Sequence, residues 1–423
     1  MKFNYGKIFL LGFGFFGVSV IWGVYNAFVP IFLANKFNLA PAFIGFFMTL
    51  DNIAALFIQP PVGAWSDRLR TPIGRRLPFI LVGAPITAIA FGLIPMASVL
   101  PLFVACTSTL LLSAALWRTP VVALMPDITP SKNRSQANGI INFMGGIGTI
   151  IALQTGGMLY KINPSFPFWL GSVLVILAAL IVFLFVKEPK KYEENDEKQP
   201  SMIESLREVL NDEDKSGARI LFAIFFWFLG YSAVETFFTL YAQKHLGINA
   251  GDGATLLSVF PLFFVLFAIP SGFIAARIGR RVAISIDLIV VAVVLALLYI
   301  LPAKTLLSAV APLPLVGISL TEGGPRMLTI AGLLLIFGGI GWAFVNINSL
   351  PMVVELTSAA RIGTFTGLYY LFSTLSAIIG PNVNGWAIQL TGNNYNVIML
   401  IAPFFMLAAL ILMLGVQRGE ATV

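Results

Sequence analysis

The sequence contains very little of the chemistry that soluble enzymes use. Among its 423 residues there is one cysteine, Cys106, and one histidine, His245. A single cysteine excludes an intramolecular disulfide and a cysteine-based metal cluster, and a single histidine leaves little for histidine-based catalysis. The sequence also shows no nucleophile–histidine–acid set and no phosphate-binding loop. We therefore expect no enzyme activity, no metal and no bound cofactor.

Charge is equally scarce. Charged residues make up 11% of the chain and hydrophobic residues 58%, whereas soluble domains carry roughly 25% charged residues. The net charge of +7 could suit a nucleic acid, but the basic residues lie at the ends of apolar segments, as they do in membrane proteins. We therefore expect the chain to lie in a lipid bilayer and to bind no nucleic acid.

Long apolar segments fill most of the chain. Crossing a bilayer takes about 20 apolar residues, and about twelve segments are long enough. The predicted helices span residues 8–33, 41–65, 77–97, 102–125, 137–160, 167–186, 220–242, 254–276, 282–301, 328–354, 364–390 and 397–416. The first segment is too long for the apolar region of a signal peptide, so we expect it to be retained. The apolar loop 302–325 is a candidate for partial re-entry into the membrane.

Basic residues fall mostly on one side of this topology. With the N-terminus in the cytoplasm, only a few of the 26 lysines and arginines lie in outer loops, namely Lys36, Lys161, Lys244, Lys304 and Arg326. Cytoplasmic loops carry the excess of positive charge. We therefore predict a multi-pass protein of the cell membrane with both termini in the cytoplasm.

Two motifs occur once in each half of the chain. The first is a basic loop, Gly63-Ala64-Trp65-Ser66-Asp67-Arg68 followed by Gly74-Arg75-Arg76, with a fainter copy at Gly272, Arg277 and Gly279-Arg280-Arg281. The second is Asp127-Ile128-Thr129 with Arg134, Gly139 and Gly157, matched by Glu355-Leu356-Thr357 with Arg361, Gly367 and Gly385. Such repeats are typical of transporters. We predict an all-α membrane protein with twelve transmembrane helices in two pseudo-symmetric six-helix bundles, residues 1–187 and 218–423, joined by a cytoplasmic linker, 188–217, with a short amphipathic helix.

The basic loops predict a cytoplasmic gate. Asp67 can cap a neighbouring helix N-terminus. Ion pairs of Arg75 or Arg76 with Asp127, and of Arg280 or Arg281 with Glu355, can hold the cytoplasmic side shut. Because Ala276 stands where Asp67 stands in the first copy, we expect the first latch to be the stronger one. The predicted gate residues are Asp67, Arg68, Arg75, Arg76, Asp127, Arg280, Arg281 and Glu355. The alternative is that these cations only set the topology.

Charges inside the predicted spans are candidates for proton coupling. Such charges cost about 2.5–3.5 kcal/mol on insertion scales, so each needs a reason to be there. Asp51 lies about ten residues into the second segment, Arg118 in the fourth and Glu235 in the seventh. An Arg118 that moves relative to Asp51 can load and unload a proton. The alternative is a fixed Asp51–Arg118 pair that only orders the bundle. Asp287 lies close to a helix end, where a structural role is expected.

Neutral polar and aromatic residues within the spans are candidates for substrate binding. Amides both donate and accept hydrogen bonds, and aromatic faces stack on sugar rings. The set suits a neutral, hydroxyl-rich solute; the alternative is that each residue only glues helices together. The candidates are Tyr25, Asn26, Asn52, Gln59, Trp117, Gln154, Tyr231, Trp342, Asn346 and Asn348.

This topology and the G-x-x-x-D-R…G-R-R loop resemble the major facilitator superfamily. The wider stretch Gln59-Pro60-Pro61, Ser66-Asp67-Arg68 and Gly74–Ile80 looks like the loop of plant sucrose carriers and glycoside–cation symporters. The resemblance implies a rocker-switch transporter in which helices 1, 4, 7 and 10 line a central cavity. Melibiose-type relatives use paired acids in helix 2 for sodium, and here that helix offers only Asp51. We therefore expect the proton, and not sodium, as the coupling ion.

These observations favour a proton-coupled symporter of a sucrose-like or other glycoside sugar that works by alternating access, as a monomer. The substrate class follows from the resemblance and the polar residues together. Two alternatives stay open. One is a proton-driven exporter of amphipathic small molecules, which the 37 phenylalanines would suit. The other is a non-transporting membrane sensor, although such sensors usually add a large soluble domain.

Overall fold

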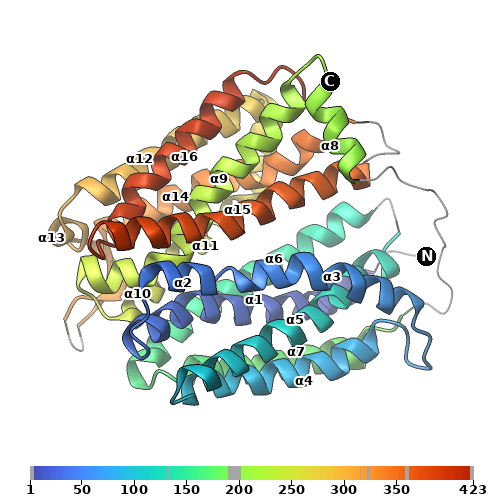
Figure 1. The fold of residues 1–423 in the computed structure, drawn as a ribbon, viewed down its shortest axis with the longest axis horizontal. Helices are drawn as coiled ribbons and strands as arrows, with labels where there is room; N and C mark the ends of the chain where they lie inside the picture. Colours follow the sequence, from blue (N-terminus) through green and yellow to red (C-terminus); the bar gives the residue numbers. More distant parts are fainter. Residues whose placement is uncertain are drawn as a thin grey trace. The chain divides into compact units, whose positions relative to one another are not determined.

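The computed structural model describes residues 4–130, 133–188, 202–314, 316–321, 324–357 and 362–419. Arg361 of the second repeat, and the linker segment 189–201, lie outside the described residues. The chain folds into two compact units (Figure 1). Unit 1 comprises residues 1–39, 50–194 and 248–258, and unit 2 comprises residues 40–49, 195–247 and 259–423.

Unit 1 is built from helices alone among the described residues. They are α1 (Tyr5–Asn35), α3 (Leu50–Arg68), α4 (Leu77–Leu93), the 3-10 turn η1 (Ile94–Met96), α5 (Leu100–Ile128), α6 (Arg134–Ile162), α7 (Phe166–Phe185) and α10 (Ala250–Leu257). The helix α1 packs against α6 and α7, and α4 lies beside α5 and α7 (Figure 1). Alanine and glycine at these contacts let the helices approach closely.

Unit 2 adds a small sheet to its helices. The helices are α2 (Pro41–Phe47), α8 (Met202–Asn211), α9 (Ser216–Tyr241), the π-helical turn η3 (Ala242–Leu246), α11 (Val259–Ile278), α12 (Arg280–Ile300), α13 (Ala303–Leu306), α14 (Ile330–Val354), α15 (Ile362–Leu390) and α16 (Val397–Leu414). The strands β1 (Ala309–Pro312), β2 (Ile318–Ser319) and β3 (Arg326–Thr329) form an antiparallel sheet in the order β1-β3-β2. The loop 302–325, which was a candidate for membrane re-entry, contains α13 and the strands β1 and β2, and β3 follows it.

The predicted helices are confirmed. Eleven spans among the described residues are long and apolar enough to cross a membrane. The 29-residue helix α15 occupies the remaining predicted segment. Large apolar side chains stay exposed along these helices, among them Phe57, Ile89, Phe273 and Ile411. Such a surface is stable in lipid and unfavourable in water. The chain is a multi-pass membrane protein whose spans are helices, as predicted.

Two predicted helices are broken at equivalent places. The second segment divides into α2 and α3 at Thr49, and the eighth divides into α10 and α11 at Ser258. Each hydroxyl donates to a carbonyl three residues earlier, Thr49 to Phe46 at 2.7 Å and Ser258 to Thr255 at 2.6 Å. Hydroxyl side chains compete in this way with the backbone ladder of a helix. The break frees the short pieces α2 and α10 to join the unit formed by the other half of the sequence.

Glycines allow α2 and α10 to pack closely in their units. A side chain on Gly45 of α2 would collide with the carbonyl of Pro381 in α15, and one on Gly157 of α6 would collide with the carbonyl of Gly251 in α10. A polar contact joins α6 and α10 as well, because Lys161 of α6 pairs with Asp252 of α10 at 2.8 Å. The repeat glycine Gly157 is therefore a packing position.

Candidate functional site

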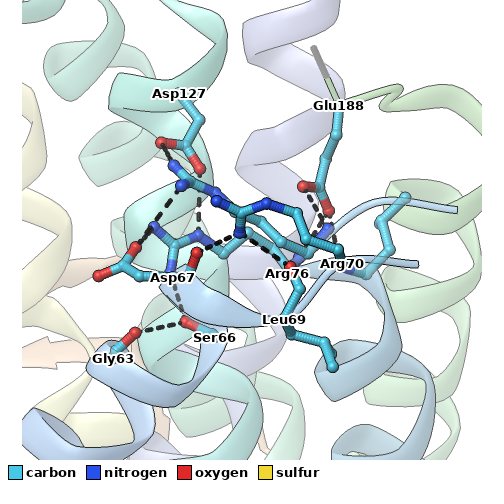
Figure 2. A network of polar contacts seen from close by, with 10 residues as sticks. Gly63, Ser66, Asp67, Leu69, Arg70, Arg76, Asp127 and Glu188 are labelled. Atoms are coloured by element: carbon cyan, nitrogen blue, oxygen red, sulfur yellow. Dashed lines mark hydrogen bonds and ion pairs between the residues drawn. The ribbon is translucent and has the colours of Figure 1, made fainter. Parts of the chain in front are cut away.

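The first arginine loop forms a closed ionic network in unit 1. The Asp127 carboxylate, near the end of α5, receives Arg75 Nη2 at 2.6 Å on one oxygen and Arg76 Nε at 3.0 Å on the other. Arg76 also donates to the Asp67 carboxylate and to the Ser66 hydroxyl at the end of α3 (Figure 2). Both pairings expected for Asp127 therefore form. The network ties α3, α5 and the loop before α4 together.

Glu188, and not Asp67, caps the helix that follows this loop. The Glu188 carboxylate lies just after α7 and accepts hydrogen bonds from the backbone N–H groups of Arg75, Arg76 and Leu77 at 2.8–2.9 Å (Figure 2). These groups have no partner within α4, and an acid at a helix N-terminus also interacts favourably with the macrodipole. The predicted cap by Asp67 is thus wrong for α4, because the Asp67 carboxylate receives arginine side chains instead.

The second arginine loop makes weaker contacts in unit 2. Arg280 Nη1 lies 3.5 Å from the Glu355 carboxylate, and 22% of the Arg280 side chain and 41% of the Glu355 side chain are exposed. Arg281 donates to the Leu414 carbonyl at 2.7 Å. In the first loop Arg68 is exposed, and within the described ranges it has no ion-pair partner. The pairing of Arg280 with Glu355 was expected; the role of all these residues as a gate stays a prediction.

Asp51 lies in the first turn of α3, because the predicted helix is broken just before it. Asn52 Nδ2 donates to its carboxylate at 2.9 Å. The charges of Asp51 and Arg118 interact, and Tyr25 of α1 is also close enough to interact with Asp51. Asp51, Asn52 and Arg118 are half-buried, whereas Tyr25 is fully buried. Unit 1 therefore brings the predicted coupling pair together beside two of the predicted substrate residues.

Unit 2 contains an aromatic cluster with one acid. The rings of Tyr231 in α9 and Trp342 in α14 stack with centroids 4.3 Å apart and planes at 6°. Phe228 meets Trp342 edge-on, and Phe260 of α11 lies against Tyr231. The carboxylate of Glu235, one turn further along α9, lies close enough to the Tyr231 hydroxyl to interact with it. Two predicted substrate residues and one predicted coupling acid therefore lie together in this unit.

The other predicted substrate residues are dispersed. Asn348 Nδ2 donates to the Phe344 carbonyl at 2.9 Å, and Gln154 accepts from the Ser258 hydroxyl at 2.9 Å. Trp117 is buried and packs against Gly83 of α4. Gln154 and Trp117 thus join neighbouring elements, whereas the Asn348 bond lies within its own helix. The remaining amides, Asn26, Gln59 and Asn346, are half-buried on α1, α3 and α14.

Sequence reasoning missed two functional candidates. The first is Glu188, which the sequence places in the linker; its signal is an acid directly after an apolar segment. The second is the pair of helix breaks at Thr49 and Ser258. Their signal is a hydroxyl residue at the same place in each half of the chain. Both depend on contacts between segments far apart in sequence.

Comparison with known proteins shows which family this chain belongs to. The profile of the Major Facilitator Superfamily matches residues 11–381. Relatives include Tetracycline resistance protein, class E, of Escherichia coli, 24% identical over 92% of this chain and 91% of that protein, and Multidrug resistance protein 1 of Bacillus subtilis (strain 168), 25% identical over 53% of this chain and 56% of that protein. Quinolone resistance protein NorA of Staphylococcus aureus (strain MSSA476) is 22% identical over 62% of this chain and 65% of that protein.

Solved structures share the fold. A mutant of the nucleoside transporter NupG has a TM-score of 0.72 at 17% identity and covers 97% of this chain and 100% of that chain. A bacterial homolog of the human lysosomal transporter Spinster has a TM-score of 0.71 at 14% identity, with full coverage of both chains. The narrower resemblance to sucrose carriers stays a prediction, because the relatives named above are drug-resistance proteins. The chain belongs to the Major Facilitator Superfamily and is a transporter, not an enzyme.

Proposed function

We propose that the chain is a proton-driven exporter of amphipathic small molecules that carry an aromatic ring. The observation that carries this proposal is the aromatic cluster of unit 2, in which Tyr231 and Trp342 stack beside the acid Glu235. Stacked aromatic rings offer a flat apolar surface to another ring. A carboxylate at its edge attracts an amine on the same molecule. The cluster therefore suits a flat cationic compound better than an inorganic ion.

The direction of transport is inferred from the relatives. Proteins named for resistance to tetracycline, quinolones and multiple drugs match this chain. A membrane transporter protects a cell from a drug when it lowers the concentration inside. This supports export across the cell membrane, with both termini in the cytoplasm as the charge asymmetry predicts.

Asp51 is the proposed coupling residue, with Glu235 as the second choice. Asp51 is half-buried. Asn52 donates a hydrogen bond to its carboxylate, and the positive charge of Arg118 interacts with it. A carboxylate that gains and loses an arginine partner can release and take up a proton as the transporter cycles. Melibiose-type relatives use a pair of acids in this helix to bind sodium. Asp51 has no such second acid beside it, so the proton is the proposed coupling ion.

A glycoside symporter is the second candidate. It is favoured by the half-buried amides Asn26, Asn52 and Asn346, which could bind hydroxyl groups. Against it, the amides of Asn348 and Gln154 are already engaged within the protein.

Transport by the full chain in proteoliposomes distinguishes the two candidates. With an imposed pH gradient, we expect accumulation of ethidium, a flat aromatic cation, and none of radiolabelled sucrose. Asp51→Asn should abolish the accumulation while binding of ethidium persists, because coupling and binding use different residues. Trp342→Ala should weaken binding by about tenfold, the loss expected for one stacking contact.

Glu213→Gln is the control, because Glu213 is an exposed acid outside the apolar segments. It should transport like the unchanged protein. Uphill uptake of sucrose driven by the pH gradient, without transport of ethidium, would reject export in favour of the symporter. Ethidium transport unaffected by Asp51→Asn would remove Asp51 from the mechanism.

A further inference from the structure

The short helix α10 comes from the second half of the sequence but lies in unit 1. It has eight residues, and seven of them, Ala250–Leu256, are buried. It packs mainly on α6, where Gly157 and Gly251 face each other and a side chain on either would collide with the carbonyl of the other. At Ser258 the chain leaves α10 and continues into α11 of unit 2. One short helix is therefore docked on one unit and continuous with the other.

Polar contacts at both ends of α10 join it to α6. At the end of α10, the Ser258 hydroxyl donates to the Gln154 side chain at 2.9 Å. At its start, Lys161 Nζ lies 2.8 Å from the Asp252 carboxylate. Lys161 is in the last turn of α6 and Asp252 in the first turn of α10, which are the helix ends that favour a cation and an anion.

The ion pair of Lys161 with Asp252 is built so that it can open. The Lys161 side chain is 40% exposed, so water reaches its ammonium group, whereas the Asp252 side chain is only 11% exposed. Asn249 donates to the Asp252 carboxylate and accepts from the Asp252 N–H at 2.8 Å. Asp252 therefore keeps Asn249 and the helix N-terminus as partners when Lys161 leaves. Partly exposed ion pairs of this kind contribute little to stability.

The contact of α2 with α15 in unit 2 repeats this arrangement. Asn382 stands three residues before the repeat glycine Gly385, as Gln154 stands before Gly157. Asn382 Nδ2 donates to the Thr49 hydroxyl at 3.4 Å, so an amide again meets the hydroxyl at the helix break. Gly385 also lies against the backbone of α2. Both units therefore hold a short helix of the other half by the same contacts.

The charged pair is where the two contacts differ. Four residues after the repeat glycine, α6 has Lys161 and α15 has Gln389. Six residues before the hydroxyl at the helix break, α10 has Asp252 and α2 has Phe43. Gln389 accepts from the Ala42 N–H at 3.3 Å, and Phe43 is exposed. Neutral residues thus stand in unit 2 at the two places where unit 1 has opposite charges.

We propose that the ion pair of Lys161 with Asp252 controls the docking of α10 on α6, whereas the docking of α2 on α15 is independent of charge. In transporters built from two repeats, one repeat moves against the other. Because α10 packs on α6 and continues into α11, such a movement requires α10 to leave α6 or to bend at Ser258. The ion pair sets how readily it does so. The proposal rests on the chain being a transporter, and not on its substrate or direction.

Labelling of a buried cysteine in the purified full chain, in detergent, tests this proposal. Cys106→Ala removes the native thiol, and Thr255→Cys places a reporter on α10, where Thr255 is 3% exposed and its hydroxyl lies against Gly157. A maleimide reacts with this cysteine when α10 leaves α6. Lys161→Gln and Asp252→Asn should each raise the labelling rate by up to about fivefold, the upper end of what a partly exposed ion pair contributes.

Salt and a double variant distinguish an ion pair from two separate packing effects. High salt should raise the labelling rate of the Thr255→Cys protein, because it screens a partly exposed pair, and should leave the rate of the Lys161→Gln variant unchanged. The variant with both Lys161→Gln and Asp252→Asn should be labelled no faster than either single variant, since both remove the same interaction. Lys304→Gln makes the same charge change on exposed α13 and should have no effect.

A second reporter makes the matched measurement on α2. Ala42→Cys places a cysteine at a position that is 7% exposed, and its labelling rate should not respond to salt. An equal response to salt of both reporters would overturn the difference between the two short helices. Labelling of Thr255→Cys that is unaffected by salt and by both substitutions would overturn the ion pair as the control of docking. A faster rate with Asp252→Asn but not with Lys161→Gln would also overturn it, because Asp252 would then act only within α10.

Discussion

The two arginine loops have similar sequences but different surroundings. In unit 1, Arg75 and Arg76 share the two oxygens of Asp127 and are mostly buried, with 12% and 5% of their side chains exposed. In unit 2, Arg280 lies 3.5 Å from the exposed Glu355. The difference indicates that the loop motif itself does not determine how strongly its arginines are held in ion pairs. The acids around it do: in the described part of the chain, Asp127 and Asp67 pair with the arginines of the first loop, whereas Glu355 lies 3.5 Å from Arg280 of the second.

Asp127→Asn is expected to have the largest effect on this comparison. It leaves both arginines in place and removes the carboxylate that neutralises them. Breaking a buried pair from one side costs up to about 3–5 kcal/mol, and Asp67, which stays beside Arg76, offsets part of this loss. We expect a matching fall in the free energy of unfolding, visible as a lower Tm of the protein in detergent.

Glu355→Gln is the matched change in unit 2. Its pair is partly exposed at 3.5 Å, and such pairs contribute about 0–1 kcal/mol. The two variants should therefore differ clearly in Tm. Equal losses would show that the network around Asp127 is no more important for stability than the pair of Arg280 with Glu355.

Glu188→Ala is expected to have the next largest effect. It removes the acceptor of three backbone N–H groups at the start of α4, and loss of a helix cap costs about 0.5–2 kcal/mol. Gln417→Ala at the equivalent place in unit 2 should change Tm little, as surface substitutions generally do. Gln417→Ala as destabilising as Glu188→Ala would mean that the Gln417 side chain contributes as much to stability as the Glu188 cap of α4.

The sequence predicts the helices well because membrane spans are long and uniformly apolar. The predicted segments 8–33 and 397–416 correspond closely to α1 and α16. The breaks at Thr49 and Ser258 could not be predicted from hydropathy, because both lie inside apolar stretches. They depend on hydroxyls that bond to local carbonyls, and on α15 and α6 as packing partners.

The ionic network was predictable only in part. The repeat placed Asp127 opposite Arg75 and Arg76, since complementary charges at neighbouring helix ends pair readily. Glu188 was not predicted as the α4 cap, because 111 residues separate it from Leu77. The stack of Tyr231 on Trp342 also could not be seen, because it depends on how α9 and α14 are rotated. Sequence patterns identify residues for a site, but helix packing decides which of them meet.

Asp214 provides the smallest expected effect, near the start of α9 in unit 2. Its carboxylate accepts from the Ser216 hydroxyl at 2.7 Å and the Ser216 N–H at 2.9 Å, and it lies 3.5 Å from Arg418. The hydrogen bonds from Ser216, and to a lesser extent the charge of Arg418, lower the pKa of Asp214 from its ordinary value of 3.8.

Because the pKa is lower in the folded state, Asp214 stabilises the protein fully above pH 3.8 and loses this effect as the pH falls through the folded-state value. Asp214→Asn should therefore lower Tm slightly near neutral pH, and the difference from the unchanged protein should vanish as the pH falls below the folded-state pKa. Scans of Tm against pH for both proteins provide the measurement. A difference that persists at the lowest pH would mean that the substitution disturbs the α9 terminus by shape and not by charge.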